Sequence, residues 1–391
     1  MEAIWRQPEW KTIMLTDLSV GNRYNLKGLP ALHDSVKKLH RYFMNRSPVE
    51  NLKEREEFLK RDLVFGLGAT QVIHSAIYAF AQILRDEASS AGRGVVRDVE
   101  DLGEQRESPT GRDTENKRRK SDAVTTNERK LIVTHDDKPG YFEYRQMIET
   151  VHAGSTVWMD IEDVIQLDDT SNVLEIINTP SNPHGRRAKP RTKARFTIHD
   201  RVNYLPFMYK NPEDYHEDDL SKDQVSIFSL PKLLGFSSSR TGYGFIRDDT
   251  VRKHMERFIM INTHGVCTDG QNRCLVAMEE IFKRGDLYFD LLTNTMSARW
   301  NRITRAIDNH NRFLFGIKDS PGKKEIILCN EQGPTAWIQI LNTDAKIYLR
   351  ENFNIVCTYG PEYGADETFA RLNMLCAQNS FVELIRRLEN S

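Results

Sequence analysis

A lysine with a hydroxyl three residues before it and a guanidinium eight residues after it is the most reactive combination in this sequence. The three residues are Ser229, Lys232 and Arg240, and they follow an apolar, strand-like run at residues 225–228. In open α/β sheets, the loops after strands carry the reactive groups. A lysine amine there can form a Schiff base with an aldehyde cofactor, while serine and arginine bind that cofactor's phosphate. An ordinary surface lysine after a strand explains this stretch alone equally well.

A glycine turn earlier in the chain is a second candidate anion site. Gly66-Leu-Gly-Ala-Thr-Gln71 follows a short apolar strand at residues 62–65 and begins a helix predicted to run through Leu84. Such a turn points free backbone N–H groups toward an anion. Gln71 occupies the place of the third glycine of a dinucleotide motif, and no acidic residue follows at the required distance. The turn therefore fits a single phosphate, with a plain strand-to-helix turn as the alternative.

The elements that must position these groups alternate as in βαβ units. The predicted strands are residues 62–65, 130–134, 156–159, 173–177, 225–228 and 242–246, and the run 173–177 is apolar throughout, as in a buried parallel strand. Helices are predicted at residues 33–43, 48–60, 248–263, 269–295, 297–308 and 380–388. Short strands at residues 336–340 and 355–357 indicate a small terminal domain.

Bulk composition describes an ordinary soluble enzyme of 391 residues, with 39% hydrophobic and 28% charged residues. The formal net charge of −1 gives no field that would attract nucleic acid or an anionic membrane. The longest apolar run is too short to span a bilayer, and no signal peptide is evident. The five cysteines lie in the second half without metal-ligand spacing, which indicates packing residues, a cytoplasmic location and no metal site.

Residues 86–129 differ in composition from the rest of the chain. They contain no aromatic residue, and they carry serine- and glycine-rich stretches and the basic cluster Lys117-Arg-Arg-Lys120. Such a segment cannot bury enough apolar surface to offset its ordering entropy, which predicts a disordered insertion. The basic cluster is interpreted as a solvated charge run, with a nuclear address or partner site as the alternative. A second basic run, at residues 186–195, is expected to be a solvated helix face or loop.

Taken in order, these motifs resemble the alliinase C-terminal family of fold-type I pyridoxal-phosphate enzymes, which includes the plant tryptophan aminotransferases. The matching stretches are residues 64–74, 139–141, 179–185, 200–206, 229–244, 299–300, 336–337 and 369–372. The resemblance implies an α/β fold with a mostly parallel, mixed seven-stranded sheet in an α/β/α large domain and a small α+β terminal domain. The expected boundaries are an N-terminal segment at 1–60 that contributes to the small domain and dimer contacts, a large domain at 61–290 and a small domain at 291–391.

The resemblance also implies roles around a pyridoxal 5′-phosphate ring. Lys232 would be the Schiff-base lysine and the base that moves the substrate's Cα proton. Asp200 would pair with the pyridinium nitrogen, Asn182 would donate to the ring's phenolic oxygen, and Tyr141 would stack on the ring.

Phosphate and substrate contacts are implied in the same way. The residues expected around the phosphate are Gly68, Ala69, Thr70, Ser229 and Arg240, with Tyr24 reaching the phosphate of a neighbouring subunit. Arg371, with Asn182, would bind the substrate's α-carboxylate, a bidentate role for which lysine is a poor replacement.

Two positions depart from the family pattern. Fold-type I enzymes usually place a tyrosine three residues after the aspartate, where it bonds the phenolic oxygen; here Asn203 stands there, beside Tyr204. Pro231 replaces the usual small polar residue before the lysine. An amide can still donate a hydrogen bond, so both departures bear on catalytic rate more than on cofactor binding.

The function implied is transfer of an amino group from an L-amino acid, which could be aromatic, to a 2-oxo acid by a homodimer. A carbon–sulfur β-lyase of the alliinase kind is the alternative, because both reactions use the same lysine. Alliinases carry a cysteine-rich N-terminal module, and no cysteine precedes Cys267 here, which favours the aminotransferase. A catalytically idle scaffold is the third hypothesis, motivated by Asn203, Pro231 and the charged insertion.

Overall fold

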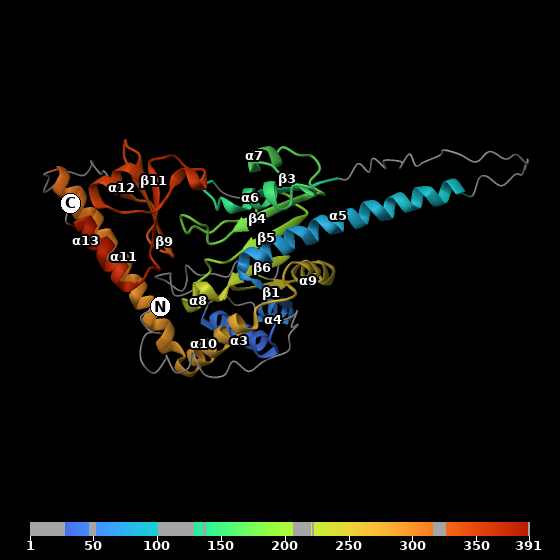
Figure 1. Cartoon of the computed structure of the whole chain (residues 1–391), viewed down its shortest axis with the longest axis horizontal. Coiled ribbons are helices and arrows are strands. Elements are labelled where there is room, and N and C mark those ends of the chain that lie inside the picture. The colour runs from blue at the N-terminus through green and yellow to red at the C-terminus, as the bar shows by residue number, and fades with distance from the viewer. Residues whose placement is uncertain are drawn as a thin grey trace, which may run out of the picture.

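A seven-stranded sheet forms the centre of the computed structural model, which describes residues 28–46, 52–100, 129–135, 138–205, 220, 223–315 and 326–389 (Figure 1). Its strands are β1 (Asp62–Leu67), β2 (Leu131–His135), β3 (Thr156–Trp158), β4 (Val173–Asn178), β5 (Phe196–Asp200), β6 (Val225–Ser229) and β7 (Thr241–Ile246). They lie in the order β1-β7-β6-β5-β4-β2-β3, and all pairs are parallel except those of β7 with β1 and β6. The predicted mostly parallel, mixed seven-stranded sheet is confirmed.

Alternation along β7 explains how helices cover both faces of this sheet. Gly242 faces α5 (Gly68–Glu100), because a Cβ there would lie 2.2 Å from the backbone nitrogen of Ala69. The next residue, Tyr243, faces the other way, and its hydroxyl lies 2.8 Å from Nε2 of His40 in α3 (Pro30–Arg46). Phe245 also points to that side, against Phe58 of α4 (Leu52–Lys60), with ring centroids 4.3 Å apart. Successive strand residues point to opposite faces, so this sequence places α5 on one face and α3 and α4 on the other.

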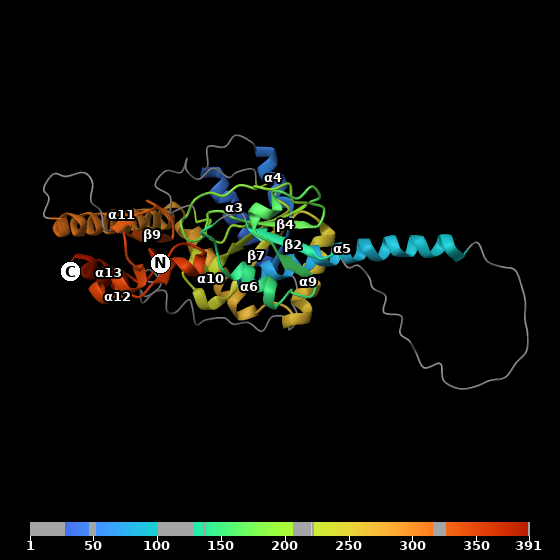
Figure 2. The same ribbon diagram turned by 90° about the horizontal axis from the view of Figure 1, so that it is seen from above.

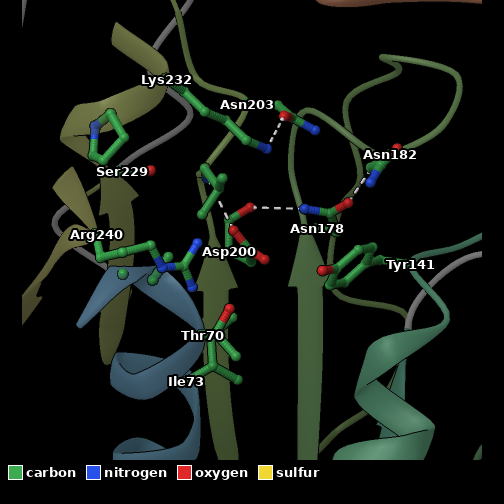
Figure 3. A pocket seen from close by; sticks show the side chains of 14 residues that line it. Thr70, Ile73, Tyr141, Asn178, Asn182, Asp200, Asn203, Ser229, Lys232 and Arg240 are labelled. Atoms are coloured by element: carbon green, nitrogen blue, oxygen red, sulfur yellow. Dashed lines mark hydrogen bonds between the residues drawn. The ribbon is translucent and has the colours of Figure 1, made fainter. Parts of the chain in front are cut away.

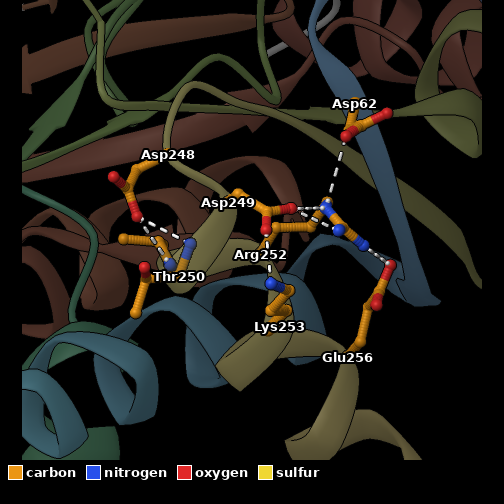
Figure 4. A network of polar contacts seen from close by, with 8 residues as sticks. Asp62, Asp248, Asp249, Thr250, Arg252, Lys253 and Glu256 are labelled. Atoms are coloured by element: carbon orange, nitrogen blue, oxygen red, sulfur yellow. Dashed lines mark hydrogen bonds and ion pairs between the residues drawn. The ribbon is translucent and has the colours of Figure 1, made fainter.

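Polar contacts fix α9 (Asp249–Thr263) beside β1, at the amino edge of the sheet (Figure 4). Asp248 caps the helix by accepting from the backbone N–H groups of Thr250 and Val251 at 2.8 and 3.0 Å. Arg252 pairs with Glu256 at 2.7 Å and reaches Asp62 of β1 at 3.3 Å. These contacts hold α9 against α5 and the sheet, away from the edge where the reactive residues lie.

A four-stranded antiparallel sheet lies apart from the first one (Figures 1 and 2). Its strands are β8 (Ile326–Leu328), β9 (Thr335–Ile340), β10 (Thr358–Tyr359) and β11 (Phe369–Asn373), in the order β10-β11-β9-β8. The helices α12 (Ala345–Phe353) and α13 (Gln378–Glu389) accompany it, and the long helix α11 (Asp286–Phe315) leads to it. Because α11 crosses residue 290 without a break, a boundary there would fall inside a helix, and the division at residues 60 and 290 stays a prediction.

Helix boundaries differ from the expectations at two places. The helix predicted at 269–295 is instead α10 (Thr268–Arg284), which ends at Gly285 with a positive φ of 58°, after which α11 runs on through 295–297. Glycine adopts such a φ without steric cost, so it ends the helix although the apolar pattern continues. Residues 355–357 are not a strand; the short strand β10 follows them.

The predicted disordered insertion is wrong for its first part, because α5 continues to Glu100 (Figures 1 and 2). Extending an existing helix adds one hydrogen bond per residue and avoids the cost of nucleation, so the helix can continue without burying apolar surface. Ion pairs secure the first turns beyond Leu84: Glu87 pairs with Arg195 at 2.5 Å, and Asp86 lies 3.5 Å from His254. Residues 101–128, including the basic cluster 117–120, lie outside the described part of the chain.

The second basic run, 186–195, is a mostly exposed loop, which is one of the two structures expected for it. None of the described helices combines the length and the apolar character needed to cross a bilayer.

Candidate active site

The residues singled out in the sequence meet in one cavity of about 200 Å³ at the carboxyl ends of β4, β5 and β6 (Figure 3). Parallel strands end at the same edge of a sheet, so loops far apart in the chain converge there. The antiparallel strand β7 brings its amino end to the same edge, which adds Arg240. The predicted residues that line this cavity are Gly68, Ala69, Thr70, Tyr141, Asn182, Asp200, Asn203, Ser229, Lys232 and Arg240. Tyr24 lies outside the described residues.

Lys232 projects into this cavity from α8 (Leu230–Leu234), a short helix that follows β6 directly (Figure 3). Pro231 occupies its first turn, where the missing N–H would have had no partner in the helix. The Lys232 amine donates to Oδ1 of Asn203 at 2.9 Å. Burial lowers the pKa of Lys232 to about 8, with Arg371 adding to the effect and Asp200 and Glu143 opposing it. At neutral pH a larger fraction of the Lys232 amine is therefore uncharged than for a lysine in water.

Asp200, the last residue of β5, is buried with partners that favour its charged form. Its Oδ2 accepts from the Tyr144 hydroxyl at 2.5 Å, and its Oδ1 accepts from the Val202 backbone at 2.9 Å. Burial raises the pKa of Asp200, while Tyr144, Val202 and Lys232 act against that rise. Burial makes an uncompensated carboxylate costly, so this site favours a cationic or hydrogen-bond-donating ligand group beside Asp200.

A close approach of β7 to the start of α5 builds the anion-binding end. Gly68 has a φ of 77°, and a Cβ on it would lie 3.0 Å from Nη2 of Arg240, so the guanidinium sits over the first turn of α5. The backbone carbonyl of Arg240 accepts from the Gly68 N–H at 2.6 Å. The hydroxyl residues Thr70 and Ser229 line the same end of the cavity. Backbone N–H groups at a helix start, hydroxyls and an arginine form a suitable set of donors for one phosphate.

Arg371 reaches the site from β11 of the other sheet. It lines an adjoining cavity of about 510 Å³, which has Lys232, Tyr141, Asn182, Asn203 and Pro231 in common with the first. Its Nη1 donates to Oδ1 of Asn182 at 2.9 Å. Its Nε is buried and has no hydrogen-bond partner among the described residues. A guanidinium on the wall of a cavity is suited to a carboxylate ligand, because its planar fork can bind two oxygens.

Three contributors were not predicted. Tyr144 was missed although it lies three residues after Tyr141, because nothing in a helical pattern marks a residue that donates to a distant carboxylate. Asn178 ends β4 directly before one of the matching stretches; its Nδ2 donates to the Asp200 carbonyl at 3.2 Å and its Oδ1 accepts from the Asn182 backbone at 2.7 Å. Glu143, at the start of α6 (Glu143–Thr150), lines the second cavity.

This donor set fits pyridoxal 5′-phosphate. A buried carboxylate, a lysine amine and a phosphate-sized cradle line one cavity, with the phenol Tyr141 on its wall. Asn203 bonds the lysine amine at the position where the family usually has a tyrosine. Among the described residues, no group of three or more metal-binding side chains is found.

Sequence comparison finds that the family profile described as allinase (Alliinase_C) matches residues 120–391. Tryptophan aminotransferase-related protein 3 of Arabidopsis thaliana is 27% identical over 231 residues, which are 57% of this chain and 49% of that protein. Alliin lyase 1 of Allium sativum is 24% identical over 274 residues, which are 66% of this chain and 54% of that protein. The chain spans about half the length of the curated relatives it matches.

Solved structures share the fold at lower identity. A methionine aminotransferase from Escherichia coli matches with a TM-score of 0.62 and 14% identity, covering 97% of this chain and 89% of that one. An aspartate aminotransferase from Thermotoga maritima gives a TM-score of 0.62 at 14% identity, with 97% and 87% covered. The fold is therefore that of the fold-type I aminotransferases.

Proposed function

This chain belongs to the allinase family, and on that premise we propose that it is a pyridoxal 5′-phosphate-dependent aminotransferase that transfers the amino group of an L-amino acid to a 2-oxo acid. The observation that carries the proposal is the cavity in which the Lys232 amine, the buried Asp200 carboxylate and the Arg240 guanidinium converge. Structural packing alone gives no reason to place these three groups around one cavity.

When bound, the cofactor supplies an aldehyde that condenses with amines and a ring that accepts electrons from the substrate's Cα. Lys232 supplies the amine that holds it and the base that moves the Cα proton. The lowered pKa of about 8 suits that role, because a base works best when its pKa lies near the working pH. Asn203 accepts a hydrogen bond from the amine and so fixes the direction in which the amine points.

Asp200 would hold a proton on the cofactor's ring nitrogen. Burial raises its pKa, and the hydrogen bonds from the Tyr144 hydroxyl and the Val202 N–H oppose that rise by favouring the ionised carboxylate. The residues at the start of α5, with Ser229 and Arg240, would hold the phosphate.

Arg371 would bind the substrate's α-carboxylate through its guanidinium, which lines the second cavity. Its hydrogen bond to Asn182 orients the guanidinium toward the cavity that it shares with Lys232. The substrate would thus be held with its Cα beside the lysine amine, and water would be displaced from the contact.

Purified protein supplied with one amino acid and no oxo acid tests this function against the lyase. An aminotransferase releases about one equivalent of 2-oxo acid per site, stops, and resumes when a second 2-oxo acid such as 2-oxoglutarate is added. A β-lyase supplied with S-alkyl-L-cysteine sulfoxide releases pyruvate and ammonia continuously. The Lys232→Ala variant is the control. If neither a 2-oxo acid nor pyruvate with ammonia is formed from any of the twenty common amino acids or the sulfoxide, the idle scaffold is the remaining hypothesis.

We propose a homodimer, since fold-type I enzymes usually complete each site with a neighbour's residues, and Tyr24 is the candidate for that contact. Active protein should elute at twice the 45.3 kDa chain mass in light-scattering chromatography. A monomeric mass for active protein contradicts this.

A further inference from the structure

A half-buried carboxylate, Glu143, lies on the wall of the substrate cavity without a cationic partner among the described residues. Burial raises the pKa of Tyr141 and the Glu143 carboxylate adds to that rise, and the same carboxylate opposes the lowering of the Lys232 pKa. A carboxylate at the first position of a helix is often no more than a favourable partner of the helix dipole. Here the same carboxylate lines a cavity that must accept a ligand, so its charge affects which ligands can bind there.

Charge balance in the cavity changes when the cofactor and a substrate are bound. Its charged walls are Glu143, Lys232 and Arg371. In the proposed function, the Lys232 amine is committed to the cofactor and the substrate carboxylate neutralises Arg371. Glu143 is then the one formal charge on these walls that nothing balances. A partly buried, unpaired charge is unfavourable, and a cation on the substrate would remove that cost.

Aromatic rings surround the same carboxylate. Tyr141, Phe142 and Tyr363 all line the cavity, and the Phe142 and Tyr363 rings meet edge to face with centroids 5.9 Å apart. The Arg371 guanidinium already lies 5.3 Å from the Tyr363 ring centroid, so this wall accepts cations. Aromatic faces beside a carboxylate bind ammonium and guanidinium groups better than neutral apolar groups.

A groove that shares Tyr141, Phe142 and Tyr363 with this cavity carries the same sign of charge. An outer groove of about 690 Å³ is bounded by Tyr141, Phe142 and Tyr363 on its inner side. Its cations are paired within the groove, Lys138 with Asp160 at 3.0 Å and Arg145 with Glu149 at 2.7 Å. Glu362 remains as an acidic side chain on that wall, and among the described residues its Oε1 accepts a backbone N–H, that of Tyr359 at 3.2 Å, without a cationic partner. A negative approach favours cationic substrates.

We propose that Glu143 is a specificity residue that selects amino donors whose side chains end in an ammonium or guanidinium group. This inference rests on the proposed function, because it uses Arg371 as the carboxylate site and Lys232 as the point of reaction. The cation would pair with Glu143 between Tyr141, Phe142 and Tyr363, while the α-carboxylate is bound by Arg371.

Non-reacting ligands test the pairing apart from catalysis. The guanidino acids 3-guanidinopropanoate, 4-guanidinobutanoate and 5-guanidinopentanoate are compared by calorimetry with 5-methylhexanoate, 6-methylheptanoate and 7-methyloctanoate, which have the same shapes without charge or donors. At least one guanidino acid should bind the cofactor-loaded protein about tenfold more tightly than its counterpart, as for a partly buried ion pair. Equal affinity in all three pairs overturns the inference, and this comparison needs no variant.

Variants identify the partner. Glu143→Gln should remove the difference while leaving the affinity for the uncharged acids unchanged. Glu162→Gln, an exposed carboxylate outside both the cavity and the groove, should keep the difference. If Glu143→Gln weakens both ligand series equally, Glu143 acts by positioning Tyr141, and the specificity role is overturned.

Turnover separates this inference from the proposed function. The ratio of kcat/KM for L-arginine, L-lysine or L-ornithine to that for L-norleucine should fall about tenfold in Glu143→Gln. Transamination that prefers neutral or aromatic donors keeps the proposed function and overturns the specificity. Selective binding of guanidino acids without any transamination overturns the proposed function and leaves the cation site in place.

Discussion

The two ends of this site are built differently. At the cofactor end, every described group comes from the seven-stranded sheet and the segments next to its strands, and two of the three charges have partners within the protein: Asp200 has Tyr144 and Val202, and Lys232 has Asn203. At the substrate end, Arg371 comes from the other sheet, and both its Nε and the Glu143 carboxylate lack a charged partner among the described residues.

This difference separates a preorganised end from one that a ligand completes. Groups already fixed by protein partners lose little freedom when a cofactor binds, so they can hold it continuously. Groups with unused donors or unbalanced charge gain most when a complementary ligand arrives. Substrate choice should therefore depend on the groups at the substrate end. Three measurements test whether the two ends act separately.

Lys232 lines both cavities, so its loss should have the largest effect. Lys232→Ala should lower turnover by at least about 10³-fold, because both the covalent hold and the proton transfer are lost. It should still retain the cofactor through Asp200 and Arg240, measured by equilibrium dialysis. In the wild type, borohydride followed by mass spectrometry should place the cofactor on Lys232. Its appearance on another lysine, or on none, contradicts the central assignment.

Arg371→Lys should have the next largest effect, confined to the substrate end. We expect kcat/KM to fall about 10²-fold, mainly through KM, because the carboxylate is bound in both ground and transition states and lysine cannot bind it in two places. Cofactor affinity should change less than twofold. If cofactor affinity falls in parallel with kcat/KM, the two ends are one unit and the comparison fails.

Tyr144→Phe should have the smallest effect and act at the cofactor end. The Tyr144 hydroxyl favours the ionised form of Asp200, so removing it raises the pKa of Asp200 further. Asp200 is then protonated at a higher pH, and the acidic limb of the kcat/KM profile should move upward by about one pH unit, the value of one hydrogen bond to a charged group. KM at pH 8 should be unchanged. A profile that falls uniformly at all pH values instead indicates a purely structural role.

Much of the cofactor end could be predicted from the sequence because its groups follow directly after strands. In a parallel sheet the carboxyl ends of the strands lie at one edge. Recognising the strands is therefore enough to predict that Asp200, Ser229 and Lys232 meet there, regardless of the loop conformations. The glycine turn at Gly68 was visible for a similar reason, since few other residues allow its backbone conformation.

Tertiary packing determined the features of the site and the fold that the sequence did not predict. Tyr144 and Glu143 are neighbours on a helix whose apolar pattern says nothing about which polar side chain meets Asp200 and which meets a cavity. The break at Gly285 was hidden by apolar residues on both sides of it. Composition suggested disorder from residue 86, although a helix needs only its own backbone hydrogen bonds to continue.

Helix α5 also offers an attachment point on this protein. It starts at the anion-binding end of the site and extends well past the sheet, so its far end stands apart from the body in both views (Figures 1 and 2). At 1.5 Å per residue, the stretch beyond residue 85 is about 20 Å long. A fluorophore or fusion partner attached near residue 100 would therefore stand clear of both cavities.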